Sequence, residues 1–378
     1  LATSRAVLAA MGVDVTSEDA MRAALEHAEN DAWTDLLPPV TVIRDGDSGA
    51  VVLAIAADAH GKTLDWRLEL ANGGSLEGKA SVSDLEQLEQ RDVLGIRRAH
   101  VRLPLPGGLP TGRHELSVAL DGVAHEMPLI VVPPACFEPA EFANGRHLWG
   151  LAVQLYALRS ERNWGIGDFG DLTRLVRLAA PHGVDVVGLN PLHAMFPAHP
   201  AAKSPYSPSS RAFLNVLYID VSAIPGYREC EPLASLMASA EFRARLEAVR
   251  DCEFVDYPQV AVLKMAAFRL LYRHFRDNAS DALRKEFARF VKARGADLEL
   301  LATFDALHMH FTVTMKEAWG FQYWPEEYRD PTSDAVTRFA LTHRNTIDFY
   351  AWLQWLADRQ LADAQTAAKD AGMAIGLY

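Results

Sequence analysis

The run of residues 149–221 constrains the fold of this chain more than any other segment. A strand-like stretch, WGLAVQLYAL, leads into the polar loop RSERNWGIGDFGDL and a helix, and a second strand, VDVVGLN, leads into a long loop that contains KSPYSPSSRAFLN. This order predicts a β-loop-α-β unit in which both long loops follow the carboxyl ends of strands. Parallel α/β folds place their chemistry at that edge of the sheet. We therefore expect a functional site on these two loops.

The remainder of the second half predicts a third strand and a large helical insertion. A stretch of helical character at about 231–369 follows the second strand and is too long for one crossover. Most of it, about residues 231–345, is therefore expected to be an inserted subdomain. Short strands that alternate with helices favour a parallel sheet. The three strands expected to be parallel neighbours lie at residues 149–158, 184–190 and 373–378.

The first half predicts different structures. Residues 1–37 are expected to be helical, because Ser17 followed by two acidic residues is typical of a helix start. Residues 38–133 instead contain short strand-like runs separated by turns rich in glycine and proline, which predict an all-β sandwich with antiparallel strands. The runs are VTVIR, AVVLAIAA, LDWRLEL, HVRLPLP, RHELSVAL and HEMPLIVV. A proline-rich linker then leads to a third region, residues 145–378.

The composition excludes several classes of protein. Of the 378 residues, 49% are hydrophobic and 23% are charged, which is typical of a globular protein. The formal net charge of -12 argues against nucleic acid or a membrane as partner, because both require a basic surface. Cys136, Cys230 and Cys252 lack metal-ligand spacing and are expected to be reduced thiols, and no metal site is predicted. Without a membrane-length apolar run or a signal-peptide layout, the prediction is a cytoplasmic protein.

Residues 165–170, GIGDFG, match the GxGxxG pattern of dinucleotide-binding folds and lie between a strand and a helix. This allows an NAD-dependent oxidoreductase as one interpretation. Against it, six mostly polar residues separate the strand from the first glycine, and Asp168 puts a carboxylate where a pyrophosphate would approach. Asn190 also stands near the position where an acidic residue would bind the ribose. The favoured interpretation is a glycine-rich loop that is capped at the helix start by Asp168 or Asp171.

The loop after the second strand contains the segment SPYSP at residues 204–208. Proline fixes φ, so Tyr206 can be held rigidly at the mouth of a barrel. Its ring suits the apolar face of a pyranose, while its hydroxyl and that of Ser204 suit sugar hydroxyl groups. The alternative is a tyrosine with a structural role only, whose ring packs against the proline-rich loop and stabilises it.

Further side chains are candidates for sugar binding. Asn163 and Trp164 lie beside Arg162 in the loop after the first strand, where the alternative is a salt-bridged, tryptophan-packed loop that supports the barrel rim. Trp319 and Trp324 lie in the aromatic stretch EAWGFQYWPEEYRDP. These rings either wall an oligosaccharide groove or pack between helices.

Four segments, LRSERNWGIGDFGDL, NPLHAMFP, SPYSPSSRAFLN and LYIDV, resemble the start of the catalytic barrel of bacterial 4-α-glucanotransferases, the amylomaltases. The resemblance implies the first three strands of a (β/α)₈ TIM barrel with a large helical insertion, after a β-sandwich. It implies transfer of α-1,4-glucan segments between maltodextrins by a retaining double displacement, with maltodextrin or starch-type glucans as partners and no cofactor. It also implies that Tyr206 lines the subsite at the scissile bond, with Ser204 nearby. Asn163, Trp164 and Trp324 complete the predicted substrate-binding residues.

Paired carboxylates are the missing element of this chemistry. A retaining mechanism needs a carboxylate nucleophile and a second carboxyl group about 5–5.5 Å away. In the family that the chain resembles, these acids come from later strands of the barrel. No catalytic residue is therefore predicted here: the acids are expected beyond Tyr378, and both ends of the chain are expected to lie within a longer protein. The alternatives are a non-catalytic carbohydrate-binding protein and, less favoured, the NAD-dependent oxidoreductase.

Overall fold

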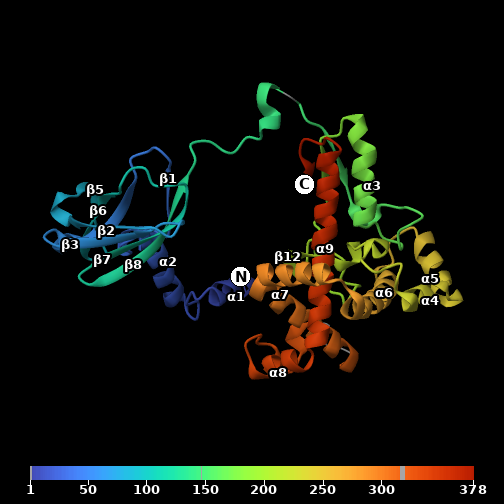
Figure 1. Ribbon diagram of the computed structural model, residues 1–378. Helices are drawn as coiled ribbons and strands as arrows, with labels where there is room; N and C mark the ends of the chain where they lie inside the picture. Colours follow the sequence, from blue (N-terminus) through green and yellow to red (C-terminus); the bar gives the residue numbers. More distant parts are fainter. Residues whose placement is uncertain (1, 146, 316–319) are drawn as a thin grey trace. The chain divides into compact units, whose positions relative to one another are not determined.

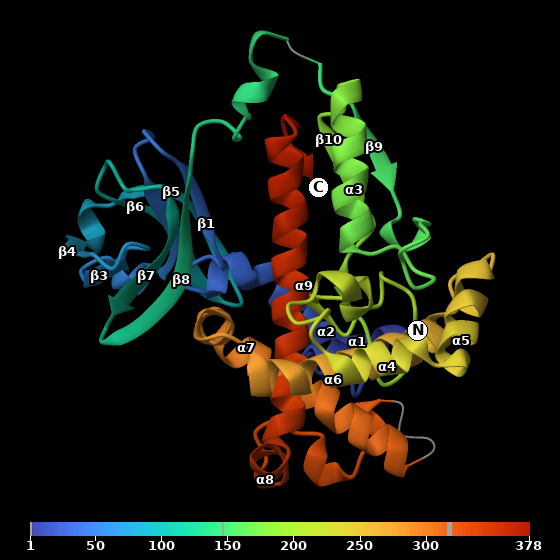
Figure 2. The same cartoon turned by 45° about the vertical axis from the view of Figure 1, so that its right-hand side comes forward.

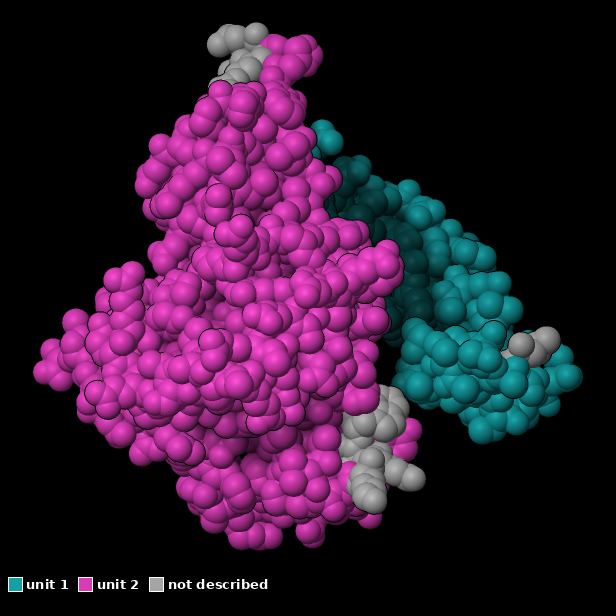
Figure 3. Space-filling view, turned by 90° about the vertical axis from the view of Figure 1, so that its right-hand side faces the viewer, with its two compact units in different colours: residues 1–138 teal, residues 139–378 magenta. Residues whose placement is uncertain are grey.

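The computed structural model describes residues 2–145, 147–315 and 320–378 of the chain (Figure 1). The chain divides into two compact units, residues 1–138 and residues 139–378 (Figure 3). The first unit consists of helices and a β-sandwich, and the second combines a small parallel sheet with many helices. None of the helices formed by the described residues is long and apolar enough to cross a membrane.

Two helices, α1 (Ala2–Ala10) and α2 (Glu18–Thr34), precede the sandwich. The predicted start of α2 is confirmed, because the hydroxyl of Ser17 accepts a hydrogen bond from the N–H of Ala20 at 3.1 Å. Near the other end of α2, Trp33 stacks on His100 of the sandwich with ring centroids 3.8 Å apart. The helix is thus fastened to the strands that follow it.

The sandwich predicted from the turn-rich pattern is confirmed. One sheet contains β1, β8, β7, β3 and β4 in that order, and the other contains β2, β6 and β5. β1 pairs with β8 in parallel, which corrects the expectation of antiparallel pairing throughout. The strands are β1 (Thr41–Arg44), β2 (Ala50–Ala56), β3 (Thr63–Glu69), β4 (Ser75–Ser81), β5 (Glu86–Val93), β6 (Ile96–Pro104), β7 (Gly112–Leu120) and β8 (Val123–Val132).

The strands β4 and β5 were not predicted. In β5 the sequence EQLEQRDV lacks a regular alternation of apolar and polar side chains, and its residues are exposed up to Asp92. It exists because it pairs with β6 along its length. The core between the two sheets comes from the strands with clear alternation and contains Leu53, Leu64, Leu68, Leu103, Leu116 and Leu129.

The second unit contains the predicted parallel sheet. Its strands are β9 (Gly150–Val153), β10 (Val186–Leu189) and β13 (Gly376–Leu377). β10 pairs in parallel with both of the others, so the three predicted neighbours are confirmed. This is the order of the first three strands of a (β/α)₈ barrel. The first strand is shorter than predicted, because residues 155–157 form a 3₁₀ helix.

Helices make up most of the remainder of the second unit. The helix α9 packs against both α3 and α7 (Figure 2). One face of α9 is buried along most of its length. The large helical insertion predicted after the second strand is therefore present. The helices are α3 (Phe169–Ala179), α4 (Glu231–Ala238), α5 (Ala240–Asp251), α6 (Tyr257–Asn278), α7 (Asp281–Thr314), α8 (Asp334–Thr342) and α9 (Arg344–Asp370).

Two glutamines of α9 hold the end of β12 (Ser210–Leu214) and the segment that follows it. Gln354 accepts a hydrogen bond from the N–H of Leu214 at 3.0 Å and donates one to its carbonyl at 2.9 Å. Gln360 makes the same two bonds with the backbone of Asp220, at 2.7 and 3.0 Å. Each amide satisfies both backbone groups of one residue, as a neighbouring strand would. This segment is thereby fixed against α9.

Candidate functional site

Tyr206 lies at the tip of a tight turn in the loop after β10. The N–H of Ser207 donates to the carbonyl of Ser204 at 3.0 Å, so Pro205 and Tyr206 are the two central residues of a β-turn. Proline suits the first central position because its φ is already fixed. Tyr206 is 74% exposed. Its ring is therefore presented to solvent and does not staple the loop.

The base of this loop is anchored by Ser209. Its hydroxyl donates to the carbonyls of Ala194 and Met195, at 3.0 and 2.8 Å. The same end of the loop is held by the antiparallel pairing of β11 (His193–Ala194) with β12. The turn that carries Tyr206 thus projects from a fixed hairpin rather than from an open loop.

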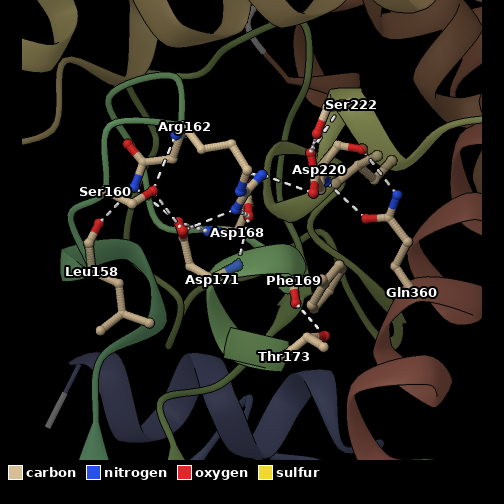
Figure 4. Close-up of polar contacts among 12 residues, drawn as sticks. Leu158, Ser160, Arg162, Asp168, Phe169, Asp171, Thr173, Asp220, Ser222 and Gln360 are labelled. Carbon is tan, nitrogen blue, oxygen red and sulfur yellow. Dashed lines mark hydrogen bonds and ion pairs between the residues drawn. The ribbon is translucent and has the colours of Figure 1, made fainter. Parts of the chain in front are cut away.

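A cluster of charged side chains fixes the other loop, which follows β9 (Figure 4). Arg162 forms ion pairs with Asp168 at 2.5 Å, with Asp171 at 2.9 Å and with Asp220 at 2.7 Å. The three carboxylates are at most 9% exposed, whereas the Arg162 side chain is 35% exposed. A second cation, the fully buried Lys264, donates to two backbone carbonyls of the segment that contains Asp220. The cluster therefore joins this loop to α3 and to that segment.

Asp168 and Asp171 also form a capping box at the start of α3. A carboxylate oxygen of Asp168 accepts from the N–H of Asp171 at 3.0 Å, and Asp171 accepts from the N–H of Asp168 at 3.2 Å. The helix start predicted at these residues is confirmed. A Cβ added to Gly170 would lie 2.3 Å from an oxygen of Asp220, so this glycine makes room for the ion cluster. The chain's own carboxylates occupy the place where a dinucleotide phosphate would bind.

Burial and charge act against each other in this cluster. Burial alone would lower the pKa of Arg162, but its hydrogen bond to Asp168 and the nearby carboxylates outweigh burial and raise that pKa. Burial raises the pKa of Asp168, and the charge of Lys264 and the Arg162 hydrogen bond oppose this only in part. Burial also lowers the pKa of Lys264. The cluster has three carboxylates and only two cations. The excess of carboxylates stabilises the charged form of Arg162 and raises its pKa, but the two cations are not enough to offset the burial of Asp168, so the pKa of Asp168 is raised too.

Comparison with known families agrees with this geometry. A family described as 4-alpha-glucanotransferase matches residues 153–377, which carry both loops and the ion cluster. The chain belongs to this family. A second family, described as the MalQ N-terminal beta sandwich domain, matches residues 36–133.

Individual members of the 4-alpha-glucanotransferase family match over different lengths. The enzyme of Haemophilus influenzae is 37% identical over 276 residues, which cover 71% of this chain and 39% of that protein. The enzyme of Mycobacterium tuberculosis is 33% identical over 385 residues, covering 100% of this chain and 51% of that protein. The crystal structure of amylomaltase from Corynebacterium glutamicum is 27% identical, with a TM-score of 0.70 over 99% of this chain and 49% of that one. The chain thus spans about half the length, or less, of these relatives.

Two residues predicted to bind substrate, Asn163 and Trp164, are buried in this member of the 4-alpha-glucanotransferase family. Asn163 is 1% exposed and donates to a carboxylate oxygen of Asp171 at 2.8 Å and to the carbonyl of Leu158 at 3.1 Å. Trp164 is 5% exposed and packs edge-on against Phe242, with ring centroids 5.4 Å apart. Both side chains support the loop, and a direct contact with a glucan would require the loop to open.

Trp324 is also buried, at 2% exposure. Its ring packs against Phe304 and Phe311 with centroids 5.5 and 5.3 Å apart, and it lines a cavity of the helical subdomain. Trp319 lies outside the described residues. Within the described parts of the chain, no group of three or more His, Cys, Asp or Glu side chains is arranged to hold a metal ion.

Three residues that form or support the ion cluster were not predicted from the sequence: Asp220, Lys264 and Gln360. Lys264 did carry a signal, because a single lysine stands within the apolar run VAVLKMAAF of a helix. A charge on the apolar face of a helix is rarely buried unless it is paired. Asp220 and Gln360 carry no local signal, since both act through contacts with distant segments.

Asp305 of α7 supports a prediction about pH and stability. Burial raises its pKa well above the usual value, and its Oδ1 has no hydrogen-bond partner within the described residues. Asp305 is therefore protonated in the folded protein at a pH where the unfolded chain is ionised. Folding therefore takes up a proton at such a pH. The contribution of Asp305 to stability is fully present below the pKa of the unfolded chain, about 3.9. As the pH rises from there towards the folded pKa, this contribution is lost by about 1.4 kcal/mol per pH unit.

The variant Asp305→Asn should therefore be more stable than the parent at pH 8 and nearly equal to it at pH 4. Urea unfolding at pH 4, 6 and 8 measures the difference. Asp297→Asn is a suitable control, because Asp297 lies on the same helix but is exposed. Parallel stability profiles for the parent and Asp305→Asn would show that Asp305 is ionised in the folded state.

Proposed function

We propose that this chain forms part of a 4-α-glucanotransferase, which cleaves an α-1,4-glucan and passes the released segment to the 4-hydroxyl group of another glucan. The observation that carries the proposal is the exposed ring of Tyr206, held on a proline-fixed turn at the carboxyl-end side of the parallel sheet. A rigid, exposed aromatic ring beside hydroxyl groups suits a neutral sugar. Membership of the family supports the same reaction.

In this proposal Tyr206 stacks on a glucosyl ring at the scissile bond, and the hydroxyl of Ser204 binds a sugar hydroxyl. Asn163 and Trp164 contribute by holding the loop after β9, and Trp324 by forming the wall of a cavity. Maltodextrins and starch-type glucans are the proposed substrates. No residue proposed to bind the sugar carries a charge, which suits a neutral substrate.

The proposed organisation has a helical segment at residues 1–37, a sandwich domain at 38–133 and part of the catalytic barrel at 145–378, with the insertion at about 231–345. The two compact units and the two family matches support this division. A cytoplasmic location is proposed from the cysteines, all three of which are free thiols.

The full-length protein that contains these residues tests the reaction. Incubated with maltotriose, it should produce glucose together with maltopentaose and longer glucans, while the total number of reducing ends stays constant. Glycosyl transfer conserves glycosidic bonds, whereas hydrolysis adds one reducing end for each bond broken. A rise in reducing ends without longer products, or no product at all, would reject the proposal.

The 378-residue chain by itself should not disproportionate maltotriose. Retaining transfer needs a nucleophile and an acid about 5–5.5 Å apart at the scissile bond. In the loops after β9 and β10, the carboxylates of Asp168 and Asp171 are buried and already paired with Arg162. Analysis of products by mass spectrometry checks this. Glucose release by the purified chain would require a carboxylate pair within it, while binding without transfer by the full-length protein would favour a carbohydrate-binding protein.

A further inference from the structure

A cavity of about 520 Å³ lies in the helical subdomain. It is formed by the end of the Tyr206 loop together with β12, by the second half of α7, and by the segment from Phe321 to the start of α8. Small-molecule sites have volumes of about 300–1,000 Å³. The cavity is therefore large enough for a ligand, and neither Tyr206 nor Ser204 lines it.

The walls of this cavity combine aromatic rings with a few polar groups. Trp324 and Phe304 form a fixed part of the wall, since their rings pack against each other. Phe321 stands at the rim and is 51% exposed. Apolar rings with a small number of polar groups suit a pyranose, which presents one apolar face and a ring of hydroxyl groups. The aromatic lining residues are Phe213, Phe304, Phe321, Trp324 and Tyr328, and the polar ones include Ser210, Asp297, Thr303 and Arg329.

The charges at the cavity favour a neutral ligand. Among the described residues that line it, Arg329 is a cation and Asp297 is a carboxylate, so neither sign dominates there. The Nε of Arg329 donates to the carbonyl of Trp324 at 2.8 Å, which holds the guanidinium group at the cavity. Neither side chain forms an ion pair with another described residue. Their remaining donors and acceptors are therefore available to hydroxyl groups.

The cavity is close to Tyr206 along the chain. Ser209, which lines it, follows Tyr206 by three residues. Three extended residues span at most about 11 Å, so the turn that carries Tyr206 cannot lie far from the cavity wall. A short oligosaccharide is long enough to bridge such a separation.

We propose that this cavity is a further glucan-binding subsite, which takes glucosyl units of a long α-1,4-glucan remote from those at Tyr206. The inference rests on the proposed transferase function. It predicts that the cavity contributes to the use of long glucans and not to that of short ones. A trisaccharide at the scissile bond has few units left to reach the cavity, whereas a heptasaccharide extends further.

Two variants of the full-length protein test this proposal. Phe321→Ala removes a ring from the rim, and Ala212→Trp adds a bulky side chain to an exposed position on the wall. Each should lower kcat/KM for maltoheptaose by about fivefold or more, because the first loses a ring that stacks on the sugar and the second fills space that the sugar would occupy. Each should change kcat/KM for maltotriose by less than about twofold. Tyr323→Ala is the matched control, because Tyr323 is 50% exposed on the same 3₁₀ turn but does not line the cavity.

The outcomes separate the two proposals. If the unmodified protein does not disproportionate maltotriose, the transferase function fails. If it does, the subsite proposal is overturned when both variants leave kcat/KM for maltoheptaose unchanged, or when they lower kcat/KM for maltoheptaose and for maltotriose equally. An equal loss for the two substrates is also expected if another segment of the protein fills the cavity. Thermal melting identifies a variant that does not fold, and the other variant then decides.

Discussion

Replacement of Arg162 by methionine should destabilise residues 139–378 by about 3 kcal/mol and lower the melting temperature of that unit by about 6–12 °C. Arg162 pairs with three carboxylates that are at most 9% exposed. Its removal leaves them buried, with the charge of Lys264 still acting on Asp168. Breaking a buried ion pair costs about 3–5 kcal/mol, and the lower end applies because the Arg162 side chain is 35% exposed and partly screened by solvent.

Differential scanning calorimetry measures this effect, and the same unit offers a control. Arg245 pairs with Glu241 at 3.1 Å, but these side chains are 52% and 78% exposed. Arg245→Met should therefore change stability by no more than about 0.5 kcal/mol. The double variant Arg162→Met/Asp168→Asn should recover part of the loss, because it removes one of the unpaired charges. Equal melting temperatures for Arg162→Met and Arg245→Met would show that the cluster does not hold the loop.

Replacement of Tyr206 by alanine should lower kcat/KM of the full-length enzyme for maltotriose by about 5- to 150-fold. This range corresponds to about 1–3 kcal/mol of transition-state binding, by analogy with the stacking of bases on aromatic side chains. Stability should be nearly unchanged, because Tyr206 is 74% exposed and its turn is held by backbone bonds. Tyr206→Phe should keep most of the activity if stacking dominates.

Steady-state kinetics together with thermal melting check this prediction. Phe254→Ala is a matched control, since Phe254 is 78% exposed in the same unit and is not proposed to touch the substrate. The control should leave both kcat/KM and stability unchanged. Normal kinetics for Tyr206→Ala would remove Tyr206 from the substrate site, and a large fall in melting temperature would assign it a structural role instead.

Local patterns in the sequence were sufficient for the parts of the fold that depend on local physics. The parallel strands were predicted from short apolar runs between helical stretches. The cap at the start of α3 was predicted at Asp168 or Asp171, because acidic side chains are preferred at helix starts. Tyr206 was predicted because prolines on both sides restrict its loop. Only the structure shows that it lies at the second central position of a turn, where its ring is exposed.

Tertiary structure decided the features that depend on contacts between distant segments. β5 has no alternating pattern and forms only because β6 pairs with it. Asn163 and Trp164 lie on a polar loop that the sequence alone cannot distinguish from an exposed one, and packing buries them. Arg162 has three carboxylate partners, of which Asp220 belongs to a distant segment that Gln360 of α9 and Lys264 of α6 hold in place. The sequence by itself determined where most strands, the helix starts and a rigid tyrosine occur, because these features follow from residues that are close together in the chain. Burial and ion pairing were decided by the tertiary structure, since they depend on which distant residues come into contact.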